Sequence, residues 1–321
     1  MTNRCLAWAA LISLSAPITM RAQNESTAAL VHMANAYRLI PNITYRTASN
    51  WEAKLDLYQP QGLTAPNPVL LYFHGGGWTM GSKESSGLAF LPYLHEGWTV
   101  VNVEYRLTSV ALAPAAVEDA RCALRWLYRS AKQYNFDTKR IVTSGQSAGG
   151  HLAMMAGMLP PSTPFDNTCP GGRSGGASSD APPNTEEMRV AAIVDWFGIS
   201  DVRDLVSGTN TKPYAVAWLG ALPNREQLAT ELSPETYVKA GMPPIISIHG
   251  DADPTVPYSQ KQRLHRALES ASVAHELVTI PGGKHGAFTD AETMIAFERI
   301  NSFLKRENLS PVHEPGRTPA R

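Results

Sequence analysis

The chain has 321 residues, of which 43% are hydrophobic and 17% are charged, and its 28 basic residues balance its 28 acidic residues. This composition is that of a globular protein, and the length suffices for one large α/β domain or two small ones. A formal net charge of zero gives no sign of the basic face that a nucleic-acid-binding protein needs, and it excludes a partner bound through overall charge alone, so we expect no nucleic-acid partner.

The N-terminal segment has the pattern of a secretory signal peptide. Arg4 precedes an apolar run from Cys5 to about Ile18, and small or polar residues follow this run. The run is too short to cross a bilayer as a helix. We therefore expect residues 1–22 to be removed during export, which leaves a secreted or periplasmic protein without a membrane span.

Strand-like and helix-like segments alternate through the rest of the chain. The alternating runs NITYRT and KLDLYQP predict an opening hairpin. Continuous apolar, β-branched runs predict six buried strands at 68–74, 98–105, 140–145, 190–198, 243–250 and 275–282. Amphipathic patterns predict helices at 114–134, 258–271 and 291–307. This alternation predicts an α/β domain over residues 42–307, with a mainly parallel eight-stranded sheet covered by helices on both faces.

Three segments interrupt or follow this alternation. Residues 160–187 are rich in glycine, serine and proline, so we expect a polar surface loop that supplies no core. Residues 199–242 are too long for a simple crossover and predict a small cap of short helices. Residues 310–321 predict a disordered tail. After signal removal only Cys122 and Cys169 remain, and two cysteines in an oxidising compartment predict a disulfide.

A serine lies in a glycine-rich turn between a predicted strand and a predicted helix. Ser147 is the centre of Gly145-Gln146-Ser147-Ala148-Gly149, which fits the GxSxG pattern. A sharp strand-to-helix turn exposes the serine hydroxyl at a helix N-terminus, where backbone amides favour developing negative charge. The pattern therefore predicts a nucleophile and not a phosphate-binding loop, which would need a lysine or dinucleotide spacing that is lacking here.

A nucleophilic serine needs a base and an acid that orients it. His285 follows the last predicted strand in GGKHGAF, and Asp253 follows the preceding strand in HGDADPTVP. Asp251 in the same loop and Asp195 at an earlier strand end remain alternatives for the acid. The other histidines, including His249, are expected to pack or to hydrogen-bond within the fold. No histidine or cysteine spacing predicts a metal site, and we expect no cofactor.

Consecutive glycines after a predicted strand indicate an oxyanion hole. The run His74-Gly75-Gly76-Gly77-Trp78 fits the HGGG motif, whose backbone amides approach a substrate oxygen closely. We expect the amides of Gly75, Gly76 and Ala148 to be the donors, with Gly77 as a possible substitute, and His74 to brace the loop. The aromatic side chains of Trp78 and Trp196 are predicted to form walls of the substrate pocket.

Five motifs together resemble a known family. HGGGW, EYRL, GQSAGGHLA, HGDADPTVP and GGKHG occur in the order found in the hormone-sensitive-lipase-like esterases of the α/β-hydrolases. The chain resembles this group from residue 42 to about residue 305, and it is most similar to secreted bacterial members that resemble bifunctional acetylxylan and feruloyl esterases (BD-FAE-like proteins). The resemblance implies Ser147 as nucleophile, Asp253 as acid and His285 as base, with structural roles for Arg106 and Asp119.

The motifs and the resemblance predict a serine hydrolase that cleaves carboxylic esters through an acyl-enzyme. The expected substrate is a small-molecule or polysaccharide ester with a short acyl or feruloyl group. An amidase, an arylformamidase or a peptidase on the same fold is one alternative. A catalytically inactive binding module is another, although such modules usually lack a member of the triad.

Overall fold

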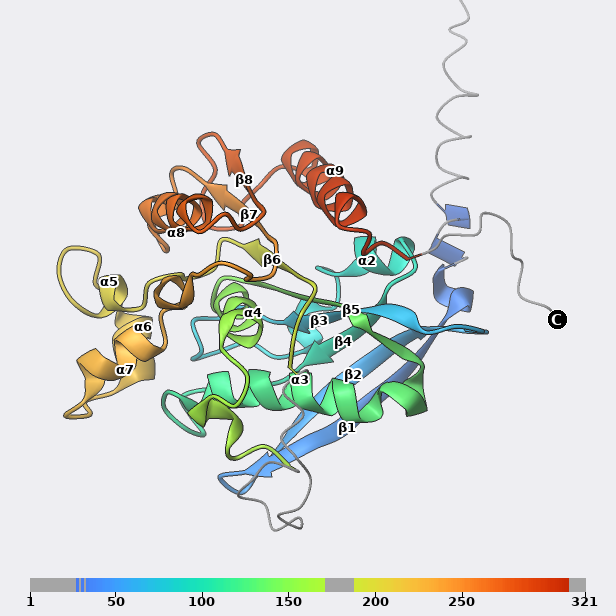
Figure 1. Cartoon of the computed structure of the whole chain (residues 1–321), viewed down its shortest axis with the longest axis horizontal. Coiled ribbons are helices and arrows are strands. Elements are labelled where there is room, and N and C mark those ends of the chain that lie inside the picture. Colours follow the sequence, from blue (N-terminus) through green and yellow to red (C-terminus); the bar gives the residue numbers. More distant parts are fainter. Residues whose placement is uncertain (1–26, 29, 32, 171–187, 312–321) are drawn as a thin grey trace, which may run out of the picture.

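The computed structural model describes residues 27–28, 30–31, 33–170 and 188–311. The predicted signal peptide and almost all of the predicted C-terminal tail lie outside these residues. One sheet contains eight strands in the order β1-β2-β4-β3-β5-β6-β7-β8, and it runs through the molecule with helices on both faces (Figure 1). The strands are β1 (Tyr37–Ala48), β2 (Trp51–Pro60), β3 (Asn67–Phe73), β4 (Thr99–Val103), β5 (Phe136–Gln146), β6 (Ala192–Trp196), β7 (Ile245–Gly250) and β8 (His275–Ile280).

The strand directions confirm the predicted sheet. β2 pairs antiparallel with β1 and with β4, and the pairings from β4 through β3, β5, β6 and β7 to β8 are parallel. The first two strands are therefore the predicted hairpin. The carboxyl ends of the parallel strands lie at one edge of the sheet, which is where α/β proteins bind ligands.

Helices cover the two faces and form two apolar cores. One core lies between the sheet and α3 (Ala115–Tyr134), α4 (Ala148–Met158) and α8 (Tyr258–Ser270). The other lies between the sheet and α2 (Leu91–His95) and α9 (Asp290–Arg306). The start of α9 follows directly from the sequence, because Thr289 and Glu292 form a reciprocal capping box. Among the described residues, no helix has the length and apolar character that a membrane crossing requires.

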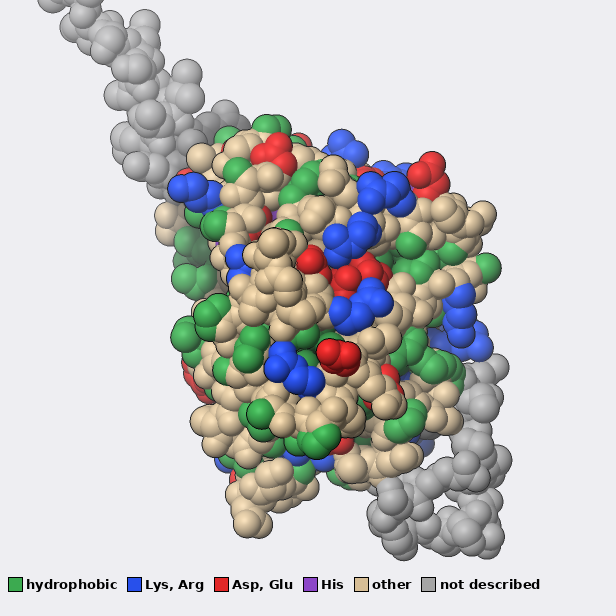
Figure 2. Space-filling view, turned by 90° about the vertical axis from the view of Figure 1, so that its left-hand side faces the viewer, with side chains coloured by type: hydrophobic (Ala, Val, Ile, Leu, Met, Phe, Trp, Pro, Cys, Tyr) green, Lys and Arg blue, Asp and Glu red, His purple; other side chains and the backbone are tan. Residues whose placement is uncertain are grey.

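The segment between β6 and β7 contains the predicted cap of short helices. These are α5 (Arg203–Val206), α6 (Pro213–Leu219), α7 (Arg225–Glu231) and the 3-10 helix η3 (Pro234–Tyr237). Arg203 and Arg263 pair with Asp201 and Glu235, which ties the cap to α8. Basic and acidic side chains are interleaved on this side of the molecule, so neither sign forms a continuous field there (Figure 2).

The first part of the segment 160–187 corrects a prediction. The sequence predicts a loop that supplies no core, yet Phe165, within the 3-10 helix η2 (Pro164–Asp166), is buried in the core under α3. Asp166 is also buried. Its carboxylate is stabilised there because it accepts hydrogen bonds from the Arg121 guanidinium at 2.7 and 2.8 Å. A composition average over 28 residues conceals these two side chains. Residues 171–187 lie outside the described part of the chain.

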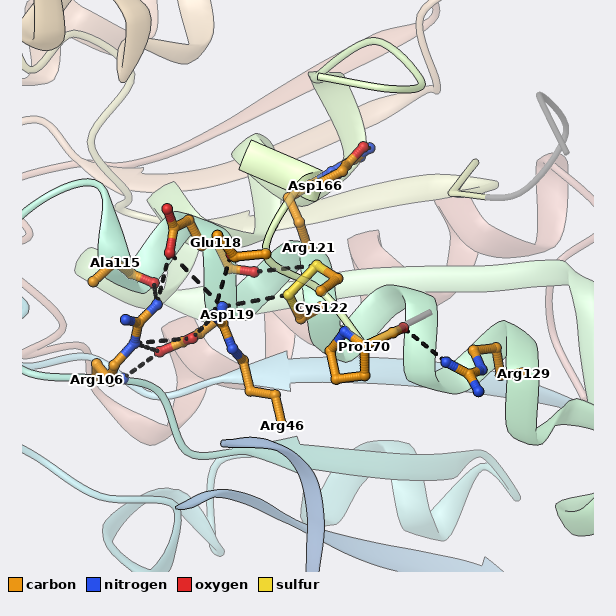
Figure 3. Close-up of a disulfide and its surroundings, with 12 residues drawn as sticks. Arg46, Arg106, Ala115, Glu118, Asp119, Arg121, Cys122, Arg129, Asp166 and Pro170 are labelled. Atoms are coloured by element: carbon orange, nitrogen blue, oxygen red, sulfur yellow. Dashed lines mark hydrogen bonds and ion pairs between the residues drawn. A yellow bond between two sulfur atoms is a disulfide. The ribbon is translucent and has the colours of Figure 1, made fainter. Parts of the chain in front are cut away.

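The same segment is joined covalently to α3. Cys169 and Cys122 form a disulfide whose closed loop spans 47 residues of sequence (Figure 3). Next to it, the buried carboxylate of Asp119 accepts hydrogen bonds from Arg46 at 2.8 Å and from Arg106 at 2.9 Å. Arg106 and Asp119 thus have structural roles, as the family resemblance implies.

Candidate active site

Ser147 occupies a strained turn between β5 and α4. Its φ of 55° and ψ of −120° lie in a region that a serine rarely adopts, and such strain persists only where the surrounding structure imposes it. Its amide donates a hydrogen bond to the Trp196 carbonyl oxygen at 2.9 Å, and its carbonyl oxygen accepts one from the His151 amide at 3.0 Å. The chain therefore passes from strand to helix within one residue, with the hydroxyl at the edge of the sheet.

Two glycines explain how this turn packs against β3. A Cβ atom on Gly149 would lie 2.1 Å from the Phe73 carbonyl oxygen, and one on Gly145 would lie 2.5 Å from the same oxygen. Neither contact is possible for a larger residue without movement of the backbone. The glycines around Ser147 are thus required by the close approach of the first turn of α4 to the end of β3.

The side chains of Ser147, His285 and Asp253 come from three separate loops and form a chain of hydrogen bonds. The Ser147 Oγ atom lies 2.8 Å from Nε2 of His285, and Nδ1 of His285 lies 2.7 Å from Oδ2 of Asp253. The second carboxylate oxygen of Asp253 accepts hydrogen bonds from the amides of Thr255 and Val256 at 2.7 and 3.0 Å. A relay of hydrogen bonds with this geometry can activate a serine hydroxyl for nucleophilic attack.

The environment of Asp253 keeps its side chain ionised. Burial alone would raise the pKa of this carboxyl, but hydrogen bonds from His249 and His285, together with the Val256 amide, bring its pKa well below the usual range. Asp253 therefore carries a negative charge opposite the imidazole of His285 throughout the neutral pH range.

The two alternative acids lie elsewhere. Asp251 accepts a hydrogen bond from the Gly282 amide at 2.6 Å and so links the loops that follow β7 and β8. Asp195 is fully buried and forms an ion pair with Lys261, and it accepts a hydrogen bond from Ser247 at 2.8 Å. Neither carboxylate is hydrogen-bonded to His285, so the geometry favours Asp253.

The HGGG segment lies directly beside Ser147. A Cβ atom on Gly75 would be 3.6 Å from Cβ of Ser147. The amides of Gly75, Gly76 and Ala148 donate no hydrogen bond to any residue in the described ranges, which leaves these donors available to a substrate oxygen. Ala148 is also the first residue of α4, so the helix dipole adds to the positive potential at this position.

His74 braces this segment from behind. Its Nδ1 atom lies 2.8 Å from the Gly75 carbonyl oxygen, and its ring stacks on Tyr105 with the centroids 4.2 Å apart. The Tyr105 hydroxyl donates a hydrogen bond to the His74 carbonyl oxygen at 2.9 Å. Burial lowers the pKa of His74 to about 4, so its imidazole is neutral near pH 7 and acts as a support.

A cavity of about 450 Å³ opens above Ser147 and His285. The HGGG segment forms one wall, and the side chains of Met80, Phe197 and Tyr214 supply apolar surface. Tyr214 comes from α6 of the cap, and its hydroxyl donates a hydrogen bond to the Thr255 carbonyl oxygen at 3.2 Å. The sequence analysis did not identify these three residues, since nothing in their local pattern separates them from ordinary core positions.

The predictions for the two tryptophans were wrong. Trp78 is fully buried and stacks on Trp218 of the cap with the ring centroids 3.9 Å apart. Trp196 packs on Phe297 of α9 at 5.1 Å, on the opposite face of the sheet from the cap. Neither side chain lines the cavity. Both tryptophans stabilise the elements that carry the site without contacting its cavity.

Comparisons with known proteins agree with this architecture. The BD-FAE family model matches residues 55–268. The curated relatives include the esterases LipC and LipQ of Mycobacterium tuberculosis, which are 26% and 28% identical over 72% and 79% of this chain. The matches cover 56% and 59% of these relatives, so the chain spans somewhat more than half of their length.

Solved structures give the same result over almost the whole described chain. A truncated carbohydrate esterase from gut microbiota superposes with a TM-score of 0.69 and is 26% identical, and the match covers 85% of this chain and 97% of that chain. The sharp turn at Ser147 between β5 and α4 is called the elbow below. The sheet order, this elbow and the similarity to the carbohydrate esterase all identify the α/β-hydrolase fold. Because the family model covers more than half of the chain as well, the protein belongs to the BD-FAE family.

Proposed function

We propose that the protein is a serine hydrolase that cleaves carboxylic esters through an acyl-enzyme. The observation that carries this proposal is the relay from Ser147 Oγ through His285 to Asp253, with distances of 2.8 and 2.7 Å, at the base of an open cavity. The names of the esterases LipC and LipQ, to which the chain is similar, support the same reaction class.

Acylation begins with the Ser147 hydroxyl. Its oxygen attacks the ester carbonyl carbon while His285 Nε2 accepts the hydroxyl proton, and the Asp253 carboxylate stabilises the resulting imidazolium. The carbonyl oxygen becomes an oxyanion and accepts hydrogen bonds from the free amides of Gly75, Gly76 and Ala148. One such donor is typically worth about a hundredfold to a thousandfold in turnover.

The alcohol leaves and water completes the cycle. His285 donates its proton to the alcohol oxygen as the carbon–oxygen bond breaks, which leaves the acyl group on Ser147. A water molecule then attacks this acyl carbon and transfers a proton to His285. Collapse of the second tetrahedral intermediate returns the proton to Ser147 and releases the carboxylic acid.

The substrate carries a short acyl chain or a compact aromatic acid on a carbohydrate. The cavity of about 450 Å³ lies at the lower end of the range for small-molecule sites, and Phe197 and Tyr214 restrict it. Each buried methylene is worth about 0.8 kcal/mol, so an acyl chain too long for this cavity gains little from its additional methylenes. The similarity to a carbohydrate esterase supports the sugar component.

The protein acts outside the cytoplasm, either secreted or in the periplasm. The disulfide between Cys122 and Cys169 supports this location, because such bonds persist mainly in oxidising compartments. The pattern of residues 1–22 supports the corresponding export route. N-terminal sequencing of the exported protein from its native host tests both points, and a mature chain that still begins at Met1 would contradict them.

Two measurements test the reaction and the substrate class. A fluorophosphonate probe should label Ser147 in the native protein and leave Ser147→Ala unlabelled. Specificity constants should then be compared across p-nitrophenyl esters from acetate to palmitate, acetylated xylan, methyl ferulate and the matching amides. We expect a maximum below eight carbons and little amide cleavage, whereas a maximum at longer chains would contradict the short-acyl assignment. Absence of labelling together with absence of ester cleavage would indicate a binding module.

A further inference from the structure

A second imidazole contacts the carboxylate of Asp253. His249, the penultimate residue of β7, is fully buried, and its Nε2 atom lies 3.2 Å from Oδ2 of Asp253. The same nitrogen lies 3.0 Å from the Val256 carbonyl oxygen. Oδ2 of Asp253 is therefore shared between His249 on one side and Nδ1 of His285 on the other.

The surroundings of His249 determine which of its nitrogens bears the proton. Nε2 faces two acceptors, the Asp253 carboxylate and the Val256 carbonyl, while Nδ1 is buried and has no partner among the described residues. A proton on Nδ1 would leave a buried donor unsatisfied and would direct the lone pair of Nε2 at a negative charge, which is costly. The proton therefore resides on Nε2, and His249 is a donor to Asp253.

We propose that His249 is a positioning residue of the catalytic relay, which it extends to four members: Ser147, His285, Asp253 and His249. The proposal rests on the serine-hydrolase function proposed above. His249 belongs to β7, which is paired on both sides with β6 and β8, so its N–H group fixes Oδ2 of Asp253 more rigidly than the loop after β7 does alone. It also withdraws part of the carboxylate's hydrogen-bonding capacity from His285.

This sharing has a definite chemical consequence. A carboxylate that accepts an additional hydrogen bond is a weaker acceptor for its other partners, because the negative charge is already partly stabilised. Loss of the His249 donor would strengthen the attraction between Asp253 and a protonated His285. Protonated His285 cannot accept the Ser147 proton, so the acidic limb of the activity profile would move to higher pH.

The other titratable groups around His249 do not provide the same contact. Tyr258 of α8 packs edge-on against its ring, with the centroids 5.8 Å apart. Tyr214 of the cap lies near Asp253, and burial followed by the Asp253 charge raises its pKa well above the usual range, so it remains neutral. Lys261 of α8 pairs with Asp195 beside Ser247, two residues before His249 on the same face of β7.

The decisive experiment compares two substitutions at this position. His249→Phe retains the ring volume and removes the donor, whereas His249→Gln retains a donor near the Nε2 position. The logarithm of kcat/KM for p-nitrophenyl acetate is measured from pH 4.5 to 9, and the labelling rate of Ser147 by a fluorophosphonate is measured over the same range. We expect the acidic limb to move up by about 0.5 to 1 pH unit in His249→Phe and to remain near its native position in His249→Gln.

A matched control separates positioning from simple packing. His265 of α8 is also a buried histidine, and it contacts His275 instead of the relay. His265→Phe should reduce thermal stability without displacing the acidic limb. An unshifted limb in His249→Phe, or an equal displacement in His249→Phe and His249→Gln, would overturn the proposal.

The native protein provides a second test that does not require the variants to fold. Nitrogen-15 NMR of the histidine side chains should show His249 protonated on Nε2, and its signals should move when Ser147 is phosphonylated, since this modification removes the Ser147 hydroxyl from His285 and so alters the other partner of Asp253. Protonation on Nδ1 would overturn the proposal. Failure of the native protein to react with the probe or to cleave any ester would refute the proposed function instead, so the two failures are distinguishable.

Discussion

The elbow at Ser147 and the charged cluster at Asp119 both contain polar groups inside the protein, but their stabilisation differs. Ser147 has an unfavourable backbone conformation, and its hydroxyl contacts His285 at the wall of an open cavity. The Asp119 carboxylate lies between two arginines and is fully buried beside a disulfide. The elbow thus retains a reactive group at the expense of strain, whereas the cluster buries a charge that depends on its two arginine partners. Substitutions at the elbow should therefore lower kcat, whereas substitutions in the charged cluster should lower the free energy of unfolding.

The largest effect is expected at Ser147. Ser147→Ala should lower kcat by about a million-fold, because removal of the nucleophile of a hydrolytic triad leaves only the remaining binding contributions. The thermal unfolding midpoint should change little, since the turn depends on the neighbouring glycines and not on the hydroxyl. Kinetics with p-nitrophenyl acetate and circular dichroism of the purified variant check both parts. Retained turnover would require a different nucleophile.

The next largest effect distinguishes the two aspartates of one loop. Asp253→Asn should lower kcat by about ten-thousand-fold, because an amide cannot stabilise the imidazolium and favours the wrong tautomer of His285. Asp251→Asn replaces only the acceptor of the Gly282 amide, so its effect on kcat should be far smaller. Steady-state kinetics of the two variants provide matched measurements. Comparable losses would contradict the assignment of Asp253 as the acid.

The third prediction concerns the charged cluster. Asp119→Asn leaves two buried arginines short of a counter-charge and should reduce the free energy of unfolding by about 3 to 5 kcal/mol. The value of kcat per active site should remain unchanged, with active sites counted by fluorophosphonate titration. Urea unfolding followed by tryptophan fluorescence measures the stability change.

Asp137 provides the control for this measurement. It pairs with Arg140 at 2.6 Å near the surface, with about a fifth of each side chain exposed. Asp137→Asn should therefore cost no more than about 1 kcal/mol. If Asp119→Asn also costs no more than the control, the Asp119 cluster contributes no special stability and the contrast with the elbow is lost.

The smallest effect is expected from the disulfide. The double substitution of Cys122 and Cys169 by alanine should lower the free energy of unfolding by about 2 to 4 kcal/mol, because the unfolded chain regains the freedom of a 47-residue loop. The activity of the folded protein should persist, since neither cysteine contacts the cavity. Urea unfolding and kinetics at 25 °C check these expectations. A large loss of kcat would show that the bond supports the elbow as well.

The sequence predicted those features of the site that depend on local chain chemistry. A strand that ends in GQSAGG requires a sharp turn, so the exposure of Ser147 followed from the glycines. His285 and Asp253 follow adjacent strands of a parallel sheet, and the carboxyl ends of such strands meet at one edge. The strand order therefore explains why His285 and Asp253 lie at the same edge of the sheet.

Side-chain direction accounts for the errors. In a strand, alternate residues face opposite sides of the sheet, so Ala192, Val194 and Trp196 point toward α9. Phe197, the residue after β6, belongs to the same core but also lines the cavity. Trp78 follows three glycines at a left-handed turn with φ of 59°, and no local pattern indicates which way its ring points. Contacts with Trp218, 140 residues later in the chain, determine its position.

The contact between His249 and Asp253 was not predicted for a related reason. A histidine at the end of a buried strand is typical of ordinary packing, and only the three-dimensional path of the loop after β7 brings its Nε2 atom to the carboxylate. The residues are four positions apart, which on a helix would indicate proximity but in a strand and loop does not.

The attachment of the cap to the loop after β7 has a consequence for divergence within the family. Tyr214 donates to the Thr255 carbonyl oxygen, and Lys212 donates to the Pro254 carbonyl oxygen at 2.8 Å. Both acceptors belong to the main chain, so they are present whatever side chains occupy positions 254 and 255. The donors, in contrast, are side chains of the cap, so a cap of different sequence stays attached to the catalytic loop only if it retains donors at positions 212 and 214. Sequence change can therefore accumulate in the catalytic loop at positions 254 and 255 without loss of these two attachments, whereas positions 212 and 214 of the cap are constrained.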